Sequence, residues 1–252
     1  MWGRTDEGFA NLPEMKDLLF VMTRLQIRIF EYPKWGDVVC AETYFTDEGR
    51  LAFRREWRLT EARSGRLLGV ATSTWVTINA AARRLAKLPD DQRNRFLRFA
   101  APNTAAVLPV EETKRKLPDM DLPGKHQAPT QVARRSDMDM NGHINNASYL
   151  AWALESVPAD VHEHYRLREI EIDFKAECHA GNTVEAHANP LAEDGQPLPP
   201  AEAAANGAAT NGAAANGSPS PSPDALFLHV LQKCDDSGCA ELVRARTTWR
   251  RA

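Results

Sequence analysis

Alternation of apolar and polar residues with a period of two dominates the first third of the chain. In residues 24–30, Leu25, Ile27 and Ile29 share one face, and polar residues occupy the other. Three further stretches repeat this alternation, and turn residues separate them: 37–46, 53–59 and 67–79. The pattern predicts a four-stranded antiparallel meander.

Residues 81–127 have a different character. The stretches 81–87 and 89–100 have helical composition, and Pro89 suits the first turn of a helix. Asp90 and Asp91 follow it and would favour the positive end of that helix. Prolines punctuate the remainder, so we expect 81–127 to be a linker that contains a helix.

A second ordered block, residues 128–252, adds elements that the first block, residues 1–80, lacks. It opens with a predicted strand at 129–135 and a predicted helix at 146–157. Four alternating strands then follow: 167–178, 182–189, 225–234 and 241–250. An antiparallel sheet curled around a central helix would satisfy this order, so we expect two related α+β domains. The first would be N-terminally truncated, without its opening strand and helix.

Residues 191–223 interrupt the second block with a low-complexity segment. Asn-Gly recurs at positions 206, 211 and 216, and large apolar residues are nearly absent. Such a segment cannot bury enough surface to offset its ordering entropy, so a disordered insertion is predicted.

Composition excludes several classes of protein. With 43% hydrophobic and 26% charged residues, the chain resembles an ordinary soluble globular protein. A net charge of −3 gives no support to a nucleic-acid binder, and no apolar run reaches the roughly 18 residues of a membrane span. The first residues lack the features of a signal or transit peptide. Cys234 and Cys239 flank Asp-Asp-Ser-Gly, which favours a hairpin turn over a zinc site, and a reducing compartment fits the cysteine content.

Residues 136–158, SDMDMNGHINNASYLAWALESVP, place a polar cluster directly before the predicted helix. Asn145 or Asn146 can cap that helix, but capping does not explain Asp139, Asn141 and His143 at alternate positions. In an extended turn these three side chains would project from the same side. A carboxylate, an amide and an imidazole facing one spot could provide a base, an oxyanion donor and a proton carrier.

A calcium loop is an alternative for the same stretch. Asp137, Asp139, Asn141 and Gly142 match its opening positions, but the position that needs a bidentate glutamate holds Ser148. Calcium binding is therefore disfavoured.

Several separated stretches closely resemble the plant/algal-type acyl-acyl carrier protein thioesterases. The strongest are RRSDMDMNGHINNASYLAWALESVP and IEIDFKAEC. Others occur in the same order, upstream TRLQIRIFEYPKWGDVV, FRREWRL, TSTWVTIN and RRLAKLP, and downstream FLHVLQ and TTWRR. The resemblance covers nearly the whole chain outside residues 191–223.

The resemblance implies two tandem hotdog folds and hydrolysis of a fatty acyl thioester to free fatty acid and carrier protein. It carries over Asp139, Asn141 and His143 as catalytic residues, joined by Glu177 in FKAEC, and implies no metal or organic cofactor. Family members begin with a transit peptide, and this chain would start just after the first central helix. The implied location is the plastid stroma, and the implied partner is an acyl carrier protein, with no nucleic acid or membrane segment. A homodimer is an open alternative to a monomer. Basic candidates for binding the acidic carrier are Arg83, Arg84, Lys87, Lys114, Arg115, Lys116, Arg134 and Arg135.

Two mechanisms compete for this reaction. In one, Cys178 attacks the thioester with His143 as base. In the other, Glu177 activates a water molecule, Asn141 holds the thioester oxygen and His143 assists. Neighbours on a strand point to opposite faces and a nearby carboxylate raises a thiol pKa, so the sequence favours Glu177. An inactive carrier-binding fragment and a hotdog dehydratase are the alternative functions.

Overall fold

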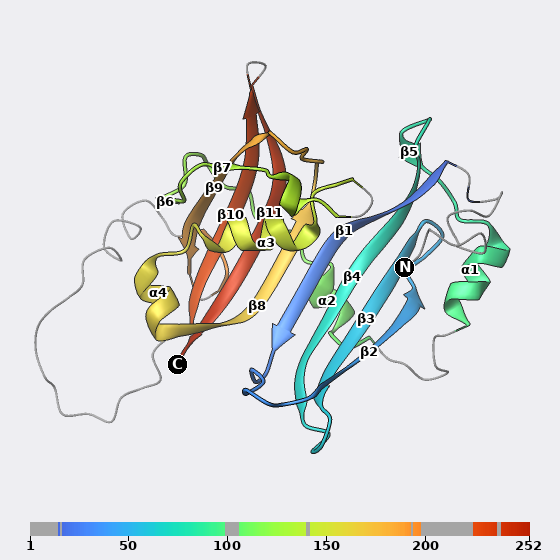
Figure 1. Ribbon diagram of the computed structural model, residues 1–252, viewed down its shortest axis with the longest axis horizontal. Coiled ribbons are helices and arrows are strands. Elements are labelled where there is room, and N and C mark those ends of the chain that lie inside the picture. Colours follow the sequence, from blue (N-terminus) through green and yellow to red (C-terminus); the bar gives the residue numbers. More distant parts are fainter. Residues whose placement is uncertain are drawn as a thin grey trace, which may run out of the picture. The chain divides into compact units, whose positions relative to one another are not determined.

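A computed structural model of the chain describes residue 15 and residues 17–98, 106–139, 142–192, 194–197, 224–235 and 238–252. The chain divides into two compact units, Met1–Arg115 and Lys116–Ala252. Within each unit the long strands pair antiparallel with their neighbours (Figure 1). Within the described part of the chain, no helix is long and apolar enough to cross a membrane.

The sheet of the first unit contains the four predicted strands in a different order from a meander. They are β1 (Leu18–Ile29), β2 (Val39–Asp47), β3 (Ala52–Glu61) and β4 (Leu67–Asn79), and their spatial order is β2-β3-β4-β1. The meander prediction is therefore wrong for β1, which pairs with β4 instead of β2. The two partners match in length, with 12 and 13 residues, and the connection 30–38 is too long for a tight hairpin.

The segment after β4 contains one correct and one wrong helix prediction. Residues 81–87 do not form a helix, because Arg84 and Leu85 form β5 (Arg84–Leu85) by pairing with the end of β4. Pairing with a sheet thus overrides helix propensity here. The other helix, α1 (Asp90–Leu97), begins directly after Pro89 as predicted. Its Phe96 packs edge-on against Phe20 and Phe45 and completes an apolar cluster with Phe53.

The polar face of this sheet is covered by residues 107–115, which include α2 (Val110–Thr113). The Arg28 guanidinium lies 2.6 Å from a Glu112 carboxylate oxygen, and Arg24 donates to the Arg115 carbonyl at 2.9 Å. Glu56 is fully buried on this face, and burial raises the pKa of its carboxyl above the usual value. The alternation of apolar and polar residues correctly predicted which residues share a face of the sheet. Both faces nevertheless contain buried residues, such as Phe53 on the apolar face and Glu56 on the polar face.

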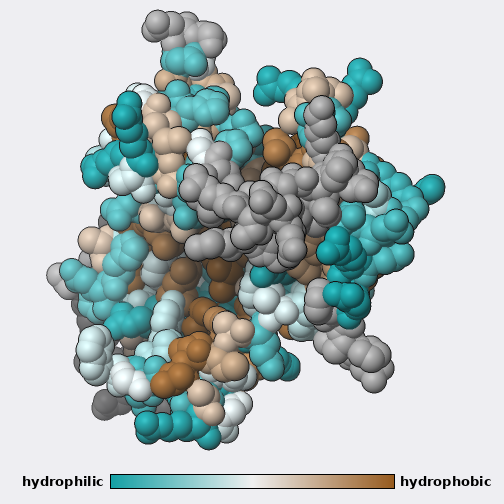
Figure 2. Space-filling model, turned by 45° about the vertical axis from the view of Figure 1, so that its right-hand side comes forward, coloured by the Kyte–Doolittle hydropathy of each residue, from teal (hydrophilic) through white to brown (hydrophobic). Residues whose placement is uncertain are grey.

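Large apolar side chains reach the surface in the connection from β1 to β2. Phe30, Tyr32, Trp35 and Val38 are all exposed, Trp35 completely so. Figure 2 shows one face of the molecule, on which hydrophobic side chains gather toward the middle and hydrophilic side chains lie mostly around them.

The sheet of the second unit repeats the strand order of the first. Its long strands are β8 (Tyr165–Phe174), β9 (Thr183–Leu191), β10 (Ala225–Asp235) and β11 (Gly238–Arg251), arranged β8-β11-β10-β9. In both sheets the first strand pairs with the fourth, and the second lies at the far side of the third. Two short strands pair with β9: β6 (His126–Gln127) and β7 (Gln131–Val132). The predicted strand 129–135 is thus reduced to β7, and Pro129, which has no N–H to donate, lies in the interruption before it.

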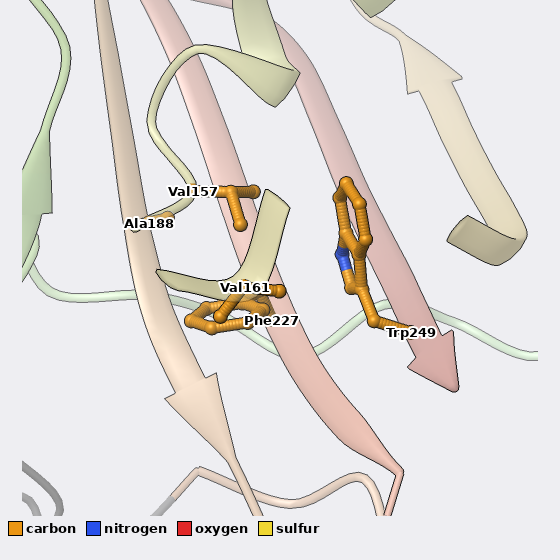
Figure 3. Close-up of a cluster of buried hydrophobic side chains, with 5 residues drawn as sticks. All are labelled: Val157, Val161, Ala188, Phe227 and Trp249. Carbon is orange, nitrogen blue, oxygen red and sulfur yellow. The ribbon is translucent and has the colours of Figure 1, made fainter. Parts of the chain in front are cut away.

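Helix α3 (Asn146–Leu154) lies across one face of this sheet and packs against β9 and β10 (Figure 1). It ends earlier than the predicted residue 157, and the short helix α4 (Ala159–His164) follows. Residues from the segment after α3, from α4 and from three strands form an apolar core (Figure 3): Val157, Val161, Ala188, Phe227 and Trp249. The helix therefore has the central position that the sequence predicted.

The hairpin of β10 and β11 carries a disulfide that the sequence pattern did not predict. Cys234 and Cys239 occupy paired positions on the two strands and are joined through their sulfurs. The expected hairpin is confirmed. Because both sulfurs take part in the disulfide, neither Cys234 nor Cys239 has a free thiol that could bind a metal ion.

Most of the predicted disordered insertion, residues 191–223, lies outside the described residues. The described parts show β9 continuing to Leu191, which pairs with Leu226 at the start of β10. The two ends of the insertion therefore lie beside each other on neighbouring strands.

Candidate active site

The polar cluster before α3 forms a tight turn. Met138 and Ile144 form an antiparallel bridge, and the Asp139 N–H donates to the His143 carbonyl at 2.7 Å. The His143 N–H in turn donates to Oδ1 of Asp139 at 3.2 Å. Asp139 and His143 are thus opposite each other, and the Asp139 carboxylate accepts one of the hydrogen bonds that hold the turn. Asn141 lies outside the described residues.

Gly142 closes this turn in a conformation that other residues rarely adopt. Its φ is +84°, and its N–H donates to the Asp139 carbonyl at 3.1 Å. An L side chain at this position would be strained. The glycine therefore allows the turn that places the His143 backbone opposite Asp139.

Asparagine capping connects the turn to the helix. The Asn145 side chain accepts from the Ala147 N–H at 3.0 Å, and the Asn145 N–H donates to the Asp137 carbonyl at 2.7 Å. The predicted capping role of Asn145 is confirmed. The positive end of the α3 dipole consequently lies next to the turn.

Glu177 lies in a loop rather than on the predicted strand, because β8 ends at Phe174. The N–H groups of Lys175 and Ala176 both donate to the Leu242 carbonyl on β11. Nζ of Lys233 on β10 donates to the Glu177 carbonyl at 2.9 Å. The Glu177 backbone is therefore fixed by two strands, while its side chain is exposed.

Cys178 is nearly completely buried, in contrast to its neighbour Glu177. Its Sγ is directed at the His179 carbonyl, and burial raises the pKa of the thiol. Strand alternation cannot explain the contrast, since both residues lie beyond the end of β8. The exposed carboxylate and the buried thiol nevertheless occupy separate environments.

Tyr149 on α3 makes a contact that sequence reasoning missed. Its hydroxyl accepts from the Cys178 N–H at 3.2 Å, and its ring packs edge-on against Trp152 and Phe174. Burial raises the pKa of Tyr149 to about 12, so the phenol stays neutral at physiological pH. The signal in the sequence was a polar hydroxyl on a residue of the predicted helix.

Hydrogen bonds of Ala133 join the segment before the turn to the residues that follow the Glu177 loop. The Gly181 N–H donates to the Ala133 carbonyl at 2.7 Å, and the Ala133 N–H donates to the Asn182 carbonyl at 2.9 Å. Ala133 lies two residues before the start of the 3-10 helix Arg135–Asp137 that leads into the turn. The second unit thus places Asp139, His143 and Glu177 on two segments that are fixed to each other.

The described residues contain no cluster of three or more His, Cys, Asp or Glu side chains that could hold a metal ion. The exposed carboxylate of Glu177 and the exposed imidazole of His143 are both groups that can transfer protons.

Comparison with known proteins assigns this arrangement to a family. The description "Acyl-ACP thioesterase C-terminal domain" matches residues 124–251, and "Acyl-ACP thioesterase N-terminal domain" matches residues 2–96. The chain belongs to the acyl-ACP thioesterase family.

Individual relatives agree with this family assignment. Oleoyl-acyl carrier protein thioesterase 1, chloroplastic, from Arabidopsis thaliana is 34% identical over 99% of this chain and 66% of its own length. The chloroplastic oleoyl-acyl carrier protein thioesterase from Coriandrum sativum shows the same identity and the same coverage. The chain therefore spans about 66% of the length of these acyl-ACP thioesterases.

Solved structures of the family share the fold. The 12:0-ACP thioesterase from Umbellularia californica is similar with a TM-score of 0.74 and 25% identity, over 99% of this chain and 80% of that one. An acyl-ACP thioesterase from Bacteroides thetaiotaomicron has a TM-score of 0.67 at 20% identity, over 96% and 81% of the two chains. The expected α+β hotdog fold of the acyl-ACP thioesterases is confirmed.

Proposed function

We propose that the protein hydrolyses the thioester between a fatty acyl chain and an acyl carrier protein, and so releases free fatty acid in the chloroplast. The observation that carries this proposal is the exposed Glu177 on a loop that continues into residues 181–182, which are hydrogen-bonded to Ala133 in the segment leading to the turn of Asp139 and His143. Family membership supports the same reaction, because the relatives named above are thioesterases of acyl carrier proteins.

In this reaction Glu177 is the general base and water is the nucleophile. The carboxylate takes a proton from water as the oxygen attacks the thioester carbon. The tetrahedral intermediate then collapses, the carbon–sulfur bond breaks, and the leaving thiolate takes up a proton. His143 positions the water or protonates that thiolate, and Asn141 holds the thioester oxygen.

Asp139 acts on the turn rather than on the substrate. Its carboxylate accepts from the His143 N–H, so it stabilises the backbone that presents the imidazole. Asp139 is therefore a positioning residue.

The environment of Cys178 argues against a cysteine nucleophile. A thiol needs to be accessible and to have a lowered pKa to attack a thioester, and Cys178 is buried with a raised pKa. Its backbone N–H is also bound to the Tyr149 hydroxyl. Cys178 thus serves as a small apolar side chain.

The carrier protein requires a positively charged surface near this site. Arg134 and Arg135 are exposed and lie at the start of the 3-10 helix that leads into the turn, so they suit an acidic partner. Replacing both with Ala should raise KM for acyl carrier protein but not for a short pantetheine thioester. A homodimer remains a prediction, and sedimentation of the chain would test it.

The deciding experiment is incubation of the chain with acyl carrier protein loaded with fatty acyl groups. Free fatty acid together with free carrier thiol supports the proposal. An enoyl thioester would establish the dehydratase alternative, and a carrier that binds without reacting would establish the inactive alternative.

A further inference from the structure

The Cys234–Cys239 disulfide closes the free end of the β10–β11 hairpin, which extends beyond the neighbouring strands (Figure 1). Cys239 is exposed and Cys234 is half-buried, so a reductant can reach the bond. The other two cysteines, Cys40 and Cys178, are free thiols. One accessible disulfide in a chain that otherwise keeps its thiols is typical of a reversible bond rather than of a structural scaffold.

The same hairpin end fixes the loop that carries Glu177. Lys233, whose Nζ donates to the Glu177 carbonyl, immediately precedes Cys234. Leu242, whose carbonyl accepts from the Lys175 and Ala176 N–H groups, follows Cys239 by three residues. Contacts to the loop therefore come from both sides of the disulfide.

An ion pair adds to this attachment. Nζ of Lys175 lies 2.9 Å from Oε1 of Glu241, two residues after Cys239, and Glu241 is also bound by Arg244. Any fraying of the hairpin end would thus loosen the backbone of Glu177 and the side chain of Lys175 together.

We propose that the Cys234–Cys239 pair is a thiol–disulfide switch that controls how firmly the Glu177 loop is held, with a dithiol donor as its reductant. This inference rests on the proposed function for its effect on catalysis. The oxidised pair, as in the structure, keeps the hairpin end closed and the general base in place.

The switching reaction is an exchange that transfers two electrons. A thiolate of the donor attacks Sγ of Cys239, the sulfur–sulfur bond breaks, and Cys234 leaves as a thiolate that takes up a proton. The second thiol of the donor then attacks the mixed disulfide and releases Cys239 as a thiol. The donor ends as a disulfide, and the cysteine pair has gained two electrons and two protons.

The test equilibrates the full chain with reduced and oxidised dithiothreitol at set ratios. Alkylation followed by mass spectrometry measures the fraction of the pair that is open, and acyl carrier protein hydrolysis is measured on the same samples. We expect kcat to fall by about threefold to tenfold on reduction, because a cross-link over so short a loop suppresses only local opening. Cys234→Ser/Cys239→Ser should show the reduced rate in both buffers, and Cys40→Ser should respond like the parent chain.

Amide hydrogen exchange separates this inference from the proposed function. Reduction should accelerate exchange at Lys175 and Ala176, whose N–H groups donate to Leu242. If the chain hydrolyses no acyl thioester, the proposed function fails and the exchange rates alone decide about the switch. A pair that never oxidises, or one that opens without changing either exchange or hydrolysis, would overturn the inference.

Discussion

Lowering the pH from 7.5 to 5.5 should destabilise the second unit through His229. This imidazole is completely buried under α3, with Nδ1 3.1 Å from the Ser156 hydroxyl and Nε2 2.8 Å from the Thr247 hydroxyl. These partners are neutral, and burial lowers the pKa of His229 to about 3. The folded protein therefore keeps the ring neutral at both pH values.

The magnitude follows from proton binding by the unfolded chain. An unfolded histidine has a pKa of about 6.5, so at pH 5.5 it is protonated while folded His229 is not. Because the folded pKa is depressed, the stability from His229 is present above the unfolded pKa and is lost as the pH falls. The loss between pH 7.5 and 5.5 is about 1.4 kcal/mol, and it does not depend on the exact folded pKa.

Urea unfolding at the two pH values, followed by tryptophan fluorescence, measures this loss. In His229→Gln the pH dependence of the unfolding free energy should shrink by about 1.4 kcal/mol relative to the parent. The control is His164→Gln, which makes the same substitution at an exposed histidine on α4 and so separates the effect of burial from that of a His-to-Gln change. An imidazole NMR signal of His229 that titrates near pH 6.5 in the folded protein would refute the reasoning.

Three further predictions concern catalysis and the insertion. Glu177→Ala should abolish hydrolysis and leave the circular dichroism spectrum unchanged, whereas Glu163→Ala, at an exposed glutamate of α4, should retain activity; an active Glu177→Ala enzyme would exclude the water mechanism. Cys178→Ala should keep most of the activity in steady-state assays, and a dead but folded variant or a trapped acyl-cysteine would establish the thiol as nucleophile. Replacing residues 198–223 by a short turn should change neither kcat nor melting temperature much, because Leu191 and Leu226 are already paired; a large loss of either would show that the insertion contributes to the fold.

Periodicity predicted the strands well where each strand has two distinct faces. Leu25 and Ile27 alternate with polar residues because the two faces of this sheet have different surroundings. The polar face contacts the segment that contains α2. The pattern could not show that β1 pairs with β4, because pairing depends on strand length and loop path rather than on alternation. It also assigned residues 81–87 to a helix, where pairing of Arg84 and Leu85 with β4 was decisive.

The candidate site was predictable to the extent that it is local in sequence. Asp139, His143 and the cap Asn145 lie within one short stretch, so their types and spacing indicated a turn before a helix. The contact of Lys233 with Glu177 joins residues 56 positions apart, and local patterns do not encode it. The disulfide depends in the same way on the register of β10 and β11.

The two units share one strand order. In each unit the segment after the first long strand therefore occupies the equivalent place. In the second unit that segment presents Glu177, and in the first it is the β1–β2 connection with exposed Phe30, Tyr32 and Trp35. Equivalent loops thus present an exposed carboxylate in the second unit and exposed aromatic side chains in the first.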